Sequence, residues 1–384
     1  MNCTWRSRLR ATDPSIARTD SRRRSATAPN RYGFAALLSL ALCAAVPMAH
    51  AETAIEAIAK QYDRHPLIML GEWHRNVQQH VFLRDLIRDP AFICRTDDIV
   101  IEFGNSRLQS LADAYASGEN VTEGELQSMF RETLVPFTWN SPVYRQFYET
   151  VREVNQKRIC PRPVRLVLGD PPIDWSRIKT LKDFELFGDR DGSFADTVER
   201  EVLAKHHHAL LIAGEPHALR TLPKADASGD GLPEPTVAQL IERKHPGVLF
   251  SIALVTTPAA AKVFRMNPPP SFKVVRGSAL EQADFGLIAP AWTATPVVVN
   301  GKHEWKLDPA KSWPRMGEVV DGVVYLGGDE TRIFPPPSIY LDPVYQQALR
   351  QRAAIIKEFN GQDFTPVLDD LVKEAERANA PAAH

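Results

Sequence analysis

Two short segments of the chain carry the same four-residue pattern, Gly-Glu-x-His. They are Gly71-Glu72-Trp73-His74 and Gly214-Glu215-Pro216-His217, and each follows an apolar run. With 20 Gly and 11 His in the chain, a Gly and a His at this spacing should occur by chance about 0.6 times. Two copies that both carry Glu are therefore informative. Glu and His together can hold a divalent metal, activate water as a general base, or supply imidazole to haem iron.

The apolar runs before these patterns belong to an alternation of strand-like and helix-like segments over residues 52–255. Short runs rich in β-branched residues predict strands at 67–70, 99–103, 164–168, 209–213 and 248–255. Amphipathic segments lie between them, such as 77–88, and another begins at Thr122, where Glu125 completes a capping-box pattern. This alternation predicts an α/β fold, a mostly parallel sheet covered by helices on both faces.

Parallel strands bring their carboxyl ends to one edge of the sheet, where open α/β sheets bind ligands. Two further acidic residues end predicted strands, Glu102 and Asp170. We therefore expect one crevice to be lined by Glu72, His74, Glu102, Asp170, Glu215 and His217. A plainer alternative is that Glu72 and Glu215 cap the following helices and the histidines bond loop carbonyls. Asp170 precedes Pro171-Pro172 and could serve only that turn.

Three more residues are weaker candidates. His80 falls six residues after His74 and could point back to the site, or could be an ordinary helical histidine. Arg75 and Arg131 could bind an anionic substrate, although a single arginine is more often a surface charge. The run His206-His207-His208 precedes a predicted strand, so we expect it at the opposite edge of the sheet from the crevice.

Composition excludes several classes of function. The chain is 44% hydrophobic and 24% charged, which is ordinary for a globular protein, and its formal net charge of -1 leaves no basic excess for nucleic acid. The motifs of serine hydrolases with a nucleophile elbow and of P-loop nucleotide enzymes are absent from the sequence. The expected partner is therefore a small-molecule ligand or substrate, with no prediction of oligomeric state.

The first 51 residues predict a secretory signal peptide. A basic stretch with Arg22, Arg23, Arg24 and Arg31 precedes an apolar run at 34–46, and Ala49-His50-Ala51 matches a small-x-small cleavage site. We expect a protein exported to the periplasm or secreted, starting near Glu52, with no transmembrane segment in the mature chain. A lipoprotein signal at Cys43 is less favoured, because Leu42 stands where a small residue is needed.

The mature chain would keep two cysteines, Cys94 and Cys160, each a few residues before a predicted strand. In an oxidising compartment an even pair could form a disulfide, or the two could remain buried thiols. Beyond the core at 52–265, triple-proline runs border an irregular segment at 266–337 with one expected strand at 322–326. This segment could pack on the core or form a lid. C-terminal helices and a tail should complete the chain at 338–384, the first helix starting after Asp342-Pro343.

These motifs resemble the Tiki superfamily, which includes ChaN-like haem-binding proteins, erythromycin esterase-like proteins, and the TraB and Tiki proteases. The resemblance covers about residues 67–255 and rests on the two Gly-Glu-x-His patterns, His80, Glu102 and the segment 139–149 before a strand. The ChaN-like branch is the most similar. That branch usually has Asp where Arg75 stands and often a His pair where Gln79-His80 stands.

The resemblance implies a site of Glu72, His74, Glu102, Glu215 and His217. For an exported ChaN-like protein it implies a crevice that binds haem, iron or another ligand, with His74, His217 and His80 as cofactor ligands. His74, His217 and Glu72 would hold a divalent metal. The alternative is a hydrolase of ester or peptide bonds in which Glu and His, with or without a metal, activate water.

Overall fold

The structure is a computed structural model that describes residues 52–135, 137–221, 235–288, 293–299, 302–308, 314–328 and 331–379. The chain divides into two units, Met1–His50 and Ala51–His384, and the second carries everything below. The signal peptide and the export of the protein fall outside the described residues and stay predictions.

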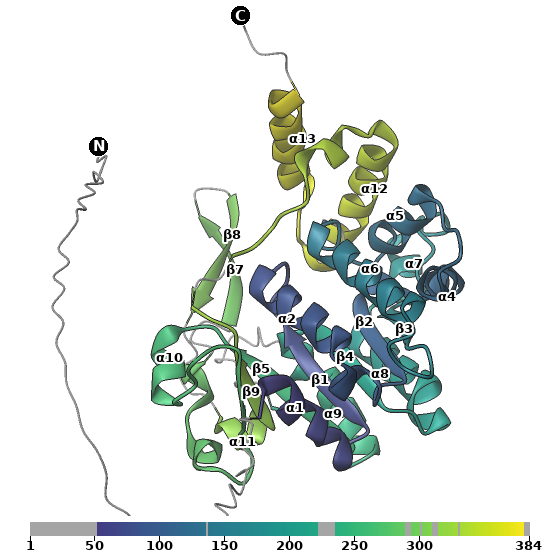
Figure 1. The fold of residues 1–384 in the computed structure, drawn as a ribbon. Helices are drawn as coiled ribbons and strands as arrows, with labels where there is room; N and C mark the ends of the chain where they lie inside the picture. The colour runs from purple at the N-terminus through teal and green to yellow at the C-terminus, as the bar shows by residue number, and fades with distance from the viewer. Residues whose placement is uncertain are drawn as a thin grey trace, which may run out of the picture. The chain divides into compact units, whose positions relative to one another are not determined.

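A seven-stranded sheet forms the centre of the described chain, in the order β3-β2-β4-β1-β5-β9-β6 (Figure 1). All neighbouring strands are parallel except β6, which runs antiparallel to β9. The expected mostly parallel α/β sheet is confirmed. A separate hairpin pairs β7 (Thr293–Val299) with β8 (Lys302–Asp308). The strands of the main sheet are β1 (Leu67–Glu72), β2 (Asp98–Asn105), β3 (Arg165–Asp170), β4 (Ala209–Gly214), β5 (Leu249–Val255), β6 (Ser271–Val274) and β9 (Gly322–Tyr325).

The central strands β1, β2, β4 and β5 are buried on both faces of the sheet, which explains why they read as mostly apolar runs rather than as an alternation of apolar and polar residues. In β1, Ile68 and Leu70 pack in a core with helices α1 to α6, whereas Leu67 and Met69 face the opposite way into a core with α8 and α9. This follows from the two-residue period of a strand. The flanking helices are α1 (Ala54–Ala59), α2 (Val77–Arg88), α3 (Pro90–Ile93), α4 (Gln109–Ser117), α5 (Glu123–Arg131), α6 (Pro142–Gln156), α8 (Arg190–Glu201) and α9 (Val237–Lys244).

Local signals in the sequence set several helix ends. Thr122 and Glu125 form the expected capping box at the start of α5. Asp342 caps the long helix α12, whose first residue is a proline, and Gly361 ends it in the left-handed conformation that glycine favours. The remaining helices are α7 (Leu181–Glu185), α10 (Pro258–Val263), α11 (Met316–Val319), α12 (Pro343–Asn360) and α13 (Thr365–Asn379), with short 3-10 turns between elements.

Part of the segment 266–337 belongs to the main sheet. Its strands β6 and β9 extend the sheet beyond β5, and a third core packs Met316, Val319 and Val323 against β5 and α10. The expected strand near 322–326 is present as β9. The boundaries proposed for the core, this segment and the C-terminal helices stay predictions.

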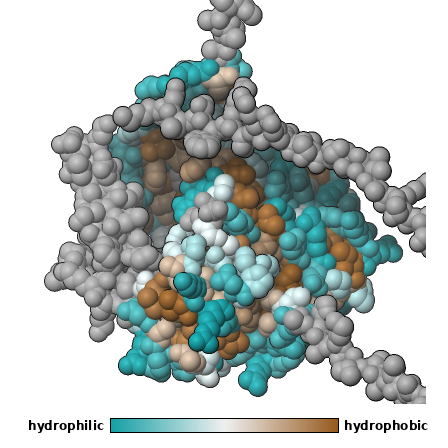
Figure 2. Space-filling model, turned by 60° about the vertical axis from the view of Figure 1, so that its left-hand side comes forward, coloured by the Kyte–Doolittle hydropathy of each residue, from teal (hydrophilic) through white to brown (hydrophobic). Residues whose placement is uncertain are grey.

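A disulfide joins Cys94, which follows α3, to Cys160. The two cysteines precede the adjacent strands β2 and β3 and therefore lie at the amino edge of the sheet. No helix within the described residues has both the length and the apolar character to cross a membrane. Figure 2 shows one face of the molecule, where apolar patches alternate with polar ones.

Candidate functional site

Acidic residues lie at or near the carboxyl ends of four neighbouring strands of the sheet. In spatial order, β3 ends on Asp170, β2 carries Glu102, β4 leads into Glu215, and β1 ends on Glu72. All four side chains are almost fully buried. Since these strands are parallel, their carboxyl ends meet at one edge, and what each carboxyl group does there depends on its neighbours.

Glu72 is an ionised carboxylate held by hydrogen bonds. Its Oε1 accepts from the Tyr144 hydroxyl at 2.9 Å and lies 2.8 Å from His80 Nε2, while Oε2 lies 3.3 Å from His74 Nδ1. Burial would raise the pKa of Glu72, but the charges and hydrogen bonds of the two histidines outweigh it and lower the pKa to about 2. Glu72 does not cap α2, since Asn76 does so.

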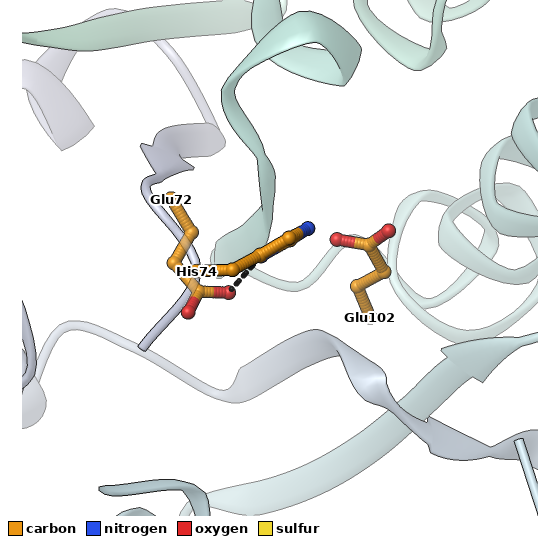
Figure 3. A group of neighbouring side chains, drawn as sticks. All are labelled: Glu72, His74 and Glu102. Carbon is orange, nitrogen blue, oxygen red and sulfur yellow. Dashed lines mark hydrogen bonds and ion pairs between the residues drawn. The ribbon is translucent and has the colours of Figure 1, made fainter. Parts of the chain in front are cut away.

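His74 lies between two carboxylates. Figure 3 shows its ring bonded to Glu72 on one side and directed with its far edge toward Glu102 on the other. The ring packs edge-on against buried Trp139, with centroids 4.7 Å apart, yet 35% of the His74 side chain is exposed. His74 is therefore a fixed imidazole that a solvent molecule or substrate can reach.

Glu102 is surrounded by donors. Its carboxylate accepts from the Gly214 backbone N–H at 2.5 Å, pairs with Arg190 Nη1 at 2.5 Å, and lies 3.4 Å from His217 Nε2. Burial would raise the pKa of Glu102, but Arg190 and then His217 hold it well below its ordinary value. Glu102 is therefore ionised, with its charge balanced mainly by Arg190.

Arg190 is a site residue that the sequence analysis missed. It also bonds Asp170, Nε to Oδ1 at 2.6 Å, and so links the ends of β2 and β3. Asp170 accepts in addition from the Leu134 N–H, and burial is the largest cause that raises its pKa. The sequence feature that could have pointed to Arg190 is the charged cluster Asp189-Arg190-Asp191 at the start of α8, but this cluster belongs to no known motif.

His217 is a cation rather than a free imidazole. Its Nδ1 lies 2.8 Å from Asp191 Oδ1, and its Nε2 faces Glu102. Burial would lower the pKa of His217, but Glu102 and Asp191 raise it to about 9. Both ring nitrogens of His217 thus face carboxylates, and the role of metal or haem ligand that the resemblance implied for this residue stays a prediction.

Glu215 is set apart from the other acids. Its Oε2 accepts from Trp73 Nε1 at 3.0 Å and from the Leu254 N–H at 2.9 Å, on the side of β1 and β5. Burial raises its pKa to about 8, and Oε1 has no hydrogen-bond partner among the described residues. Glu215 is therefore neutral at pH 7, and its carboxyl group serves the contact with Trp73 rather than the cluster around His74.

The glycines of the two patterns allow the turns to approach each other closely. In the pairing of β1 with β4, Gly71 lies opposite Ala213 and Glu72 opposite Gly214. A Cβ at Gly71 would lie 2.7 Å from Glu215 Cγ, and a Cβ at Gly214 would lie 3.0 Å from His74 Cε1. Each glycine thus makes room for a side chain of the other turn.

The described residues offer one group that could hold a metal ion. A ligand atom from each of Glu72, His74 and Glu102 lies within 4.8 Å of the others. Two carboxylates and one imidazole suit a divalent cation such as iron, manganese or zinc. The group differs from the expected set in that Glu102 takes the place of His217.

The weaker candidates have different environments. His80 is fully buried and bonds Glu72, so it points back to the site. Arg131 pairs with Asp342 at 3.4 Å and stacks on Tyr345, which ties α5 to α12. Arg75 follows His74 directly and stacks on Phe334. His207 bonds Asp98 at the amino end of β2, at the opposite edge of the sheet from the site.

Comparisons with known proteins give structural similarity without sequence similarity. No protein-family model matches the chain, and no curated protein sequence matches it. Among solved structures, a protein from Bacillus cereus aligns with 74% of this chain and 100% of its own, at 11% identity and a TM-score of 0.46. An erythromycin esterase in its open conformation aligns with 70% of this chain and 91% of its own, at 12% identity and a TM-score of 0.45.

ChaN of Campylobacter jejuni, described as binding haem cofacially, aligns with 52% of this chain and 85% of its own, at 13% identity and a TM-score of 0.35. The structural neighbours thus include an erythromycin esterase and a ChaN protein, two kinds of protein named by the sequence resemblance.

Proposed function

We propose that this protein hydrolyses ester or peptide bonds, with His74 as the general base and Glu72 as the group that orients it. One observation carries the proposal: an imidazole that is 35% exposed has its Nδ1 3.3 Å from a buried, ionised carboxylate. A carboxylate that accepts from Nδ1–H leaves Nε2 to take a proton. Glu72 is itself fixed by His80 and Tyr144, so the orientation of the ring is preorganised.

The chemistry follows from the order of the groups. A water molecule beside His74 would lose a proton to Nε2 as its oxygen attacks the carbonyl carbon of the substrate. The imidazolium would then return this proton to the leaving alcohol oxygen or amine nitrogen as the bond from that atom to the carbonyl carbon breaks, which releases the carboxylic acid and regenerates neutral His74. Glu102, on the far side of the ring, would stabilise the imidazolium that forms, and Arg190 keeps Glu102 ionised for this role. If a divalent cation is bound, Glu72, His74 and Glu102 would hold it, and it would lower the pKa of a bound water.

The test is hydrolysis of a panel of chromogenic esters and peptides by purified residues 52–384 and by His74→Ala. Loss of a general base should lower kcat/KM by about 10²–10⁴-fold. The matched control is His207→Ala, because His207 is also 35% exposed and also bonds a buried aspartate, but at the opposite edge of the sheet. Equal turnover by wild type and His74→Ala would refute the assignment.

Binding of haem or iron in the same crevice is the second candidate function. It is favoured by the grouping of His74, partly exposed, with Glu72 and Glu102. Haem titrated into the protein should then give a saturable shift of its visible absorbance band. The shift should be lost in His74→Ala and largely kept in His217→Ala, since His217 is held by Asp191 and Glu102. If the wild type gives no shift, haem binding is contradicted and only the hydrolase proposal remains.

Export to the periplasm or secretion is part of the proposal and rests on residues 1–51. Sequencing the amino terminus of the protein recovered from outside the cytoplasm should give a chain that starts at Glu52. A chain that keeps Met1 and stays in the cytoplasm would contradict export.

A further inference from the structure

Arg75, the residue after His74, adopts an unusual backbone conformation. Its φ is 68°, in the left-handed region that non-glycine residues rarely occupy. Both backbone groups are held: the N–H donates to the Tyr144 hydroxyl at 3.1 Å, and the carbonyl accepts from the Ile333 N–H at 3.2 Å. The same Tyr144 hydroxyl bonds Glu72. The placement of Arg75 is therefore built into the network that positions His74.

The guanidinium of Arg75 has a stacking partner but no counter-ion. It lies over the ring of Phe334, 4.5 Å from the centroid. Among the described residues it forms no ion pair with a carboxylate, and its Nε is buried without a hydrogen-bond partner. Glu72, the acidic residue whose charge acts on it, already bonds His74, His80 and Tyr144. Removing a donor from water without pairing it is costly.

Other arginines around the site are neutralised. Arg190 pairs with Glu102 and Asp170, and Arg131 pairs with Asp342. Arg75 has no such carboxylate partner among the described residues. Arg332 stacks on Trp73, the residue on the other side of His74. An anion beside Arg75 would pair with its guanidinium and offset the desolvation of this group.

We infer that Arg75 binds an anionic group of the substrate, a carboxylate or a phosphate, next to the bond that His74 hydrolyses. The substrate class is then an ester or amide with an anionic group close to the reacting carbonyl. Glu72 bonds His74 and also acts on the charge of Arg75, so the guanidinium and the imidazole lie around the same carboxylate. The hydrolytic half of this inference rests on the proposed function, whereas the anion site itself does not.

The experiment compares two chromogenic esters of the same alcohol: p-nitrophenyl hemisuccinate, which carries a free carboxylate, and its uncharged methyl ester. The wild type, Arg75→Gln, Arg75→Lys and the control Arg243→Gln are assayed with both. Arg243 is an exposed arginine near the end of α9. Calorimetric titration of the wild type and Arg75→Gln with succinate and with inorganic phosphate measures anion binding without turnover and separates the two kinds of anion.

The ratio of kcat/KM for the charged ester to that for the uncharged ester should fall about tenfold in Arg75→Gln, mainly through KM. This loss corresponds to one hydrogen-bonded ion pair. Arg75→Lys should keep part of the ratio, because it keeps the charge but not the planar donors. Arg243→Gln should keep all of it. A ratio unchanged in Arg75→Gln would overturn the inference, even if both esters are hydrolysed.

The calorimetric arm separates the two proposals. If the wild type hydrolyses neither ester but binds succinate or phosphate, and Arg75→Gln does not, the hydrolase proposal fails and the anion site stands. If there is neither turnover nor anion binding that depends on Arg75, both are overturned.

Discussion

The two Gly-Glu-x-His turns share a sequence pattern and a place at the same sheet edge, yet their carboxyl groups behave in opposite ways. Glu72 meets two histidines and a tyrosine, and its pKa is lowered to about 2. Among the described residues, Glu215 accepts from the N–H groups of Trp73 and Leu254 alone, and burial raises its pKa to about 8. Both side chains are buried to the same degree. The difference shows that neighbouring charges, rather than the motif, decide which glutamate works as an anion.

The histidines of the two turns also differ, and here the charged residue belongs to the second turn. His74 bonds the Glu72 carboxylate and has an exposed edge, whereas His217 is held between Asp191 and Glu102, which raise its pKa to about 9. The first turn therefore offers a negative charge and an accessible base. The second offers a neutral acid and a positive charge. We expect the first turn to carry the chemistry and the second to support it.

The sharpest test of this comparison is the same isosteric change in both turns. Glu72→Gln should lower kcat/KM for ester hydrolysis by about a thousandfold, because an amide neither stabilises the imidazolium nor selects the productive tautomer of His74. Glu215→Gln should stay within about threefold of the wild type, since its carbonyl oxygen can still accept from Trp73. Steady-state kinetics on purified proteins measure both. Comparable losses in the two variants would mean that the turns share the chemistry.

The second test is the pH dependence of stability. In the unfolded chain Glu215 should ionise near 4.5, but in the folded protein near 8. Between these values the folded state holds one proton more, so the free energy of unfolding falls as pH rises, by up to about 1.4 kcal/mol per pH unit. Urea unfolding of both proteins at about pH 5 and about pH 8 measures this effect. From the lower to the higher pH, the free energy of unfolding should fall less in Glu215→Gln than in the wild type, by up to about 4 kcal/mol.

Glu72 should show the opposite dependence. The stability that ionised Glu72 contributes is fully present above about pH 4.5 and is lost as the pH falls through about 2.

His217 also affects the Glu215 experiment, because it loses its stabilising charge as the pH rises through about 9. This contribution is common to the wild type and Glu215→Gln, so it cancels in the difference between them. An identical loss of stability in both proteins between pH 5 and 8 would show that Glu215 is already ionised at neutral pH.

The smallest expected effect concerns the hydroxyl that holds Glu72. Tyr144→Phe removes one of its donors and should reduce kcat/KM about 3- to 10-fold, the value of one hydrogen bond. Tyr148→Phe is the matched control, because it lies on the same helix and is equally buried but donates to the Phe103 carbonyl. If both variants lose activity equally, the effect comes from packing of α6 and not from orientation of Glu72.

Local patterns were enough to predict the elements of the fold. Apolar β-branched runs located β1 to β5, and capping residues such as Thr122 and Asp342 marked helix starts. The spatial order of the strands is a long-range property, and no local pattern indicated that β4 lies between β1 and β2. That order is nevertheless what brings the two turns together.

The site could be predicted only in part for the same reason. Glu72, His74 and Glu102 follow from strand ends, and the structure groups them. Arg190 comes from a helix without a motif, and its role depends on how α8 packs over the ends of β2 and β3. The direction of Glu215, toward Trp73 and β5, depends on the 3-10 turn that starts at this residue. Neither the role of Arg190 nor the direction of the Glu215 side chain could be predicted from the spacing of residues in the sequence.

The reciprocal contact of Gly71 with Glu215, and of Gly214 with His74, has a consequence for how this protein can change over evolutionary time. A larger residue at either glycine would displace the side chain from the opposite turn, and only a smaller residue there could restore the fit. The two patterns should thus drift as a linked pair, and a redesign that grafts one turn onto another scaffold would need to carry its counterpart with it.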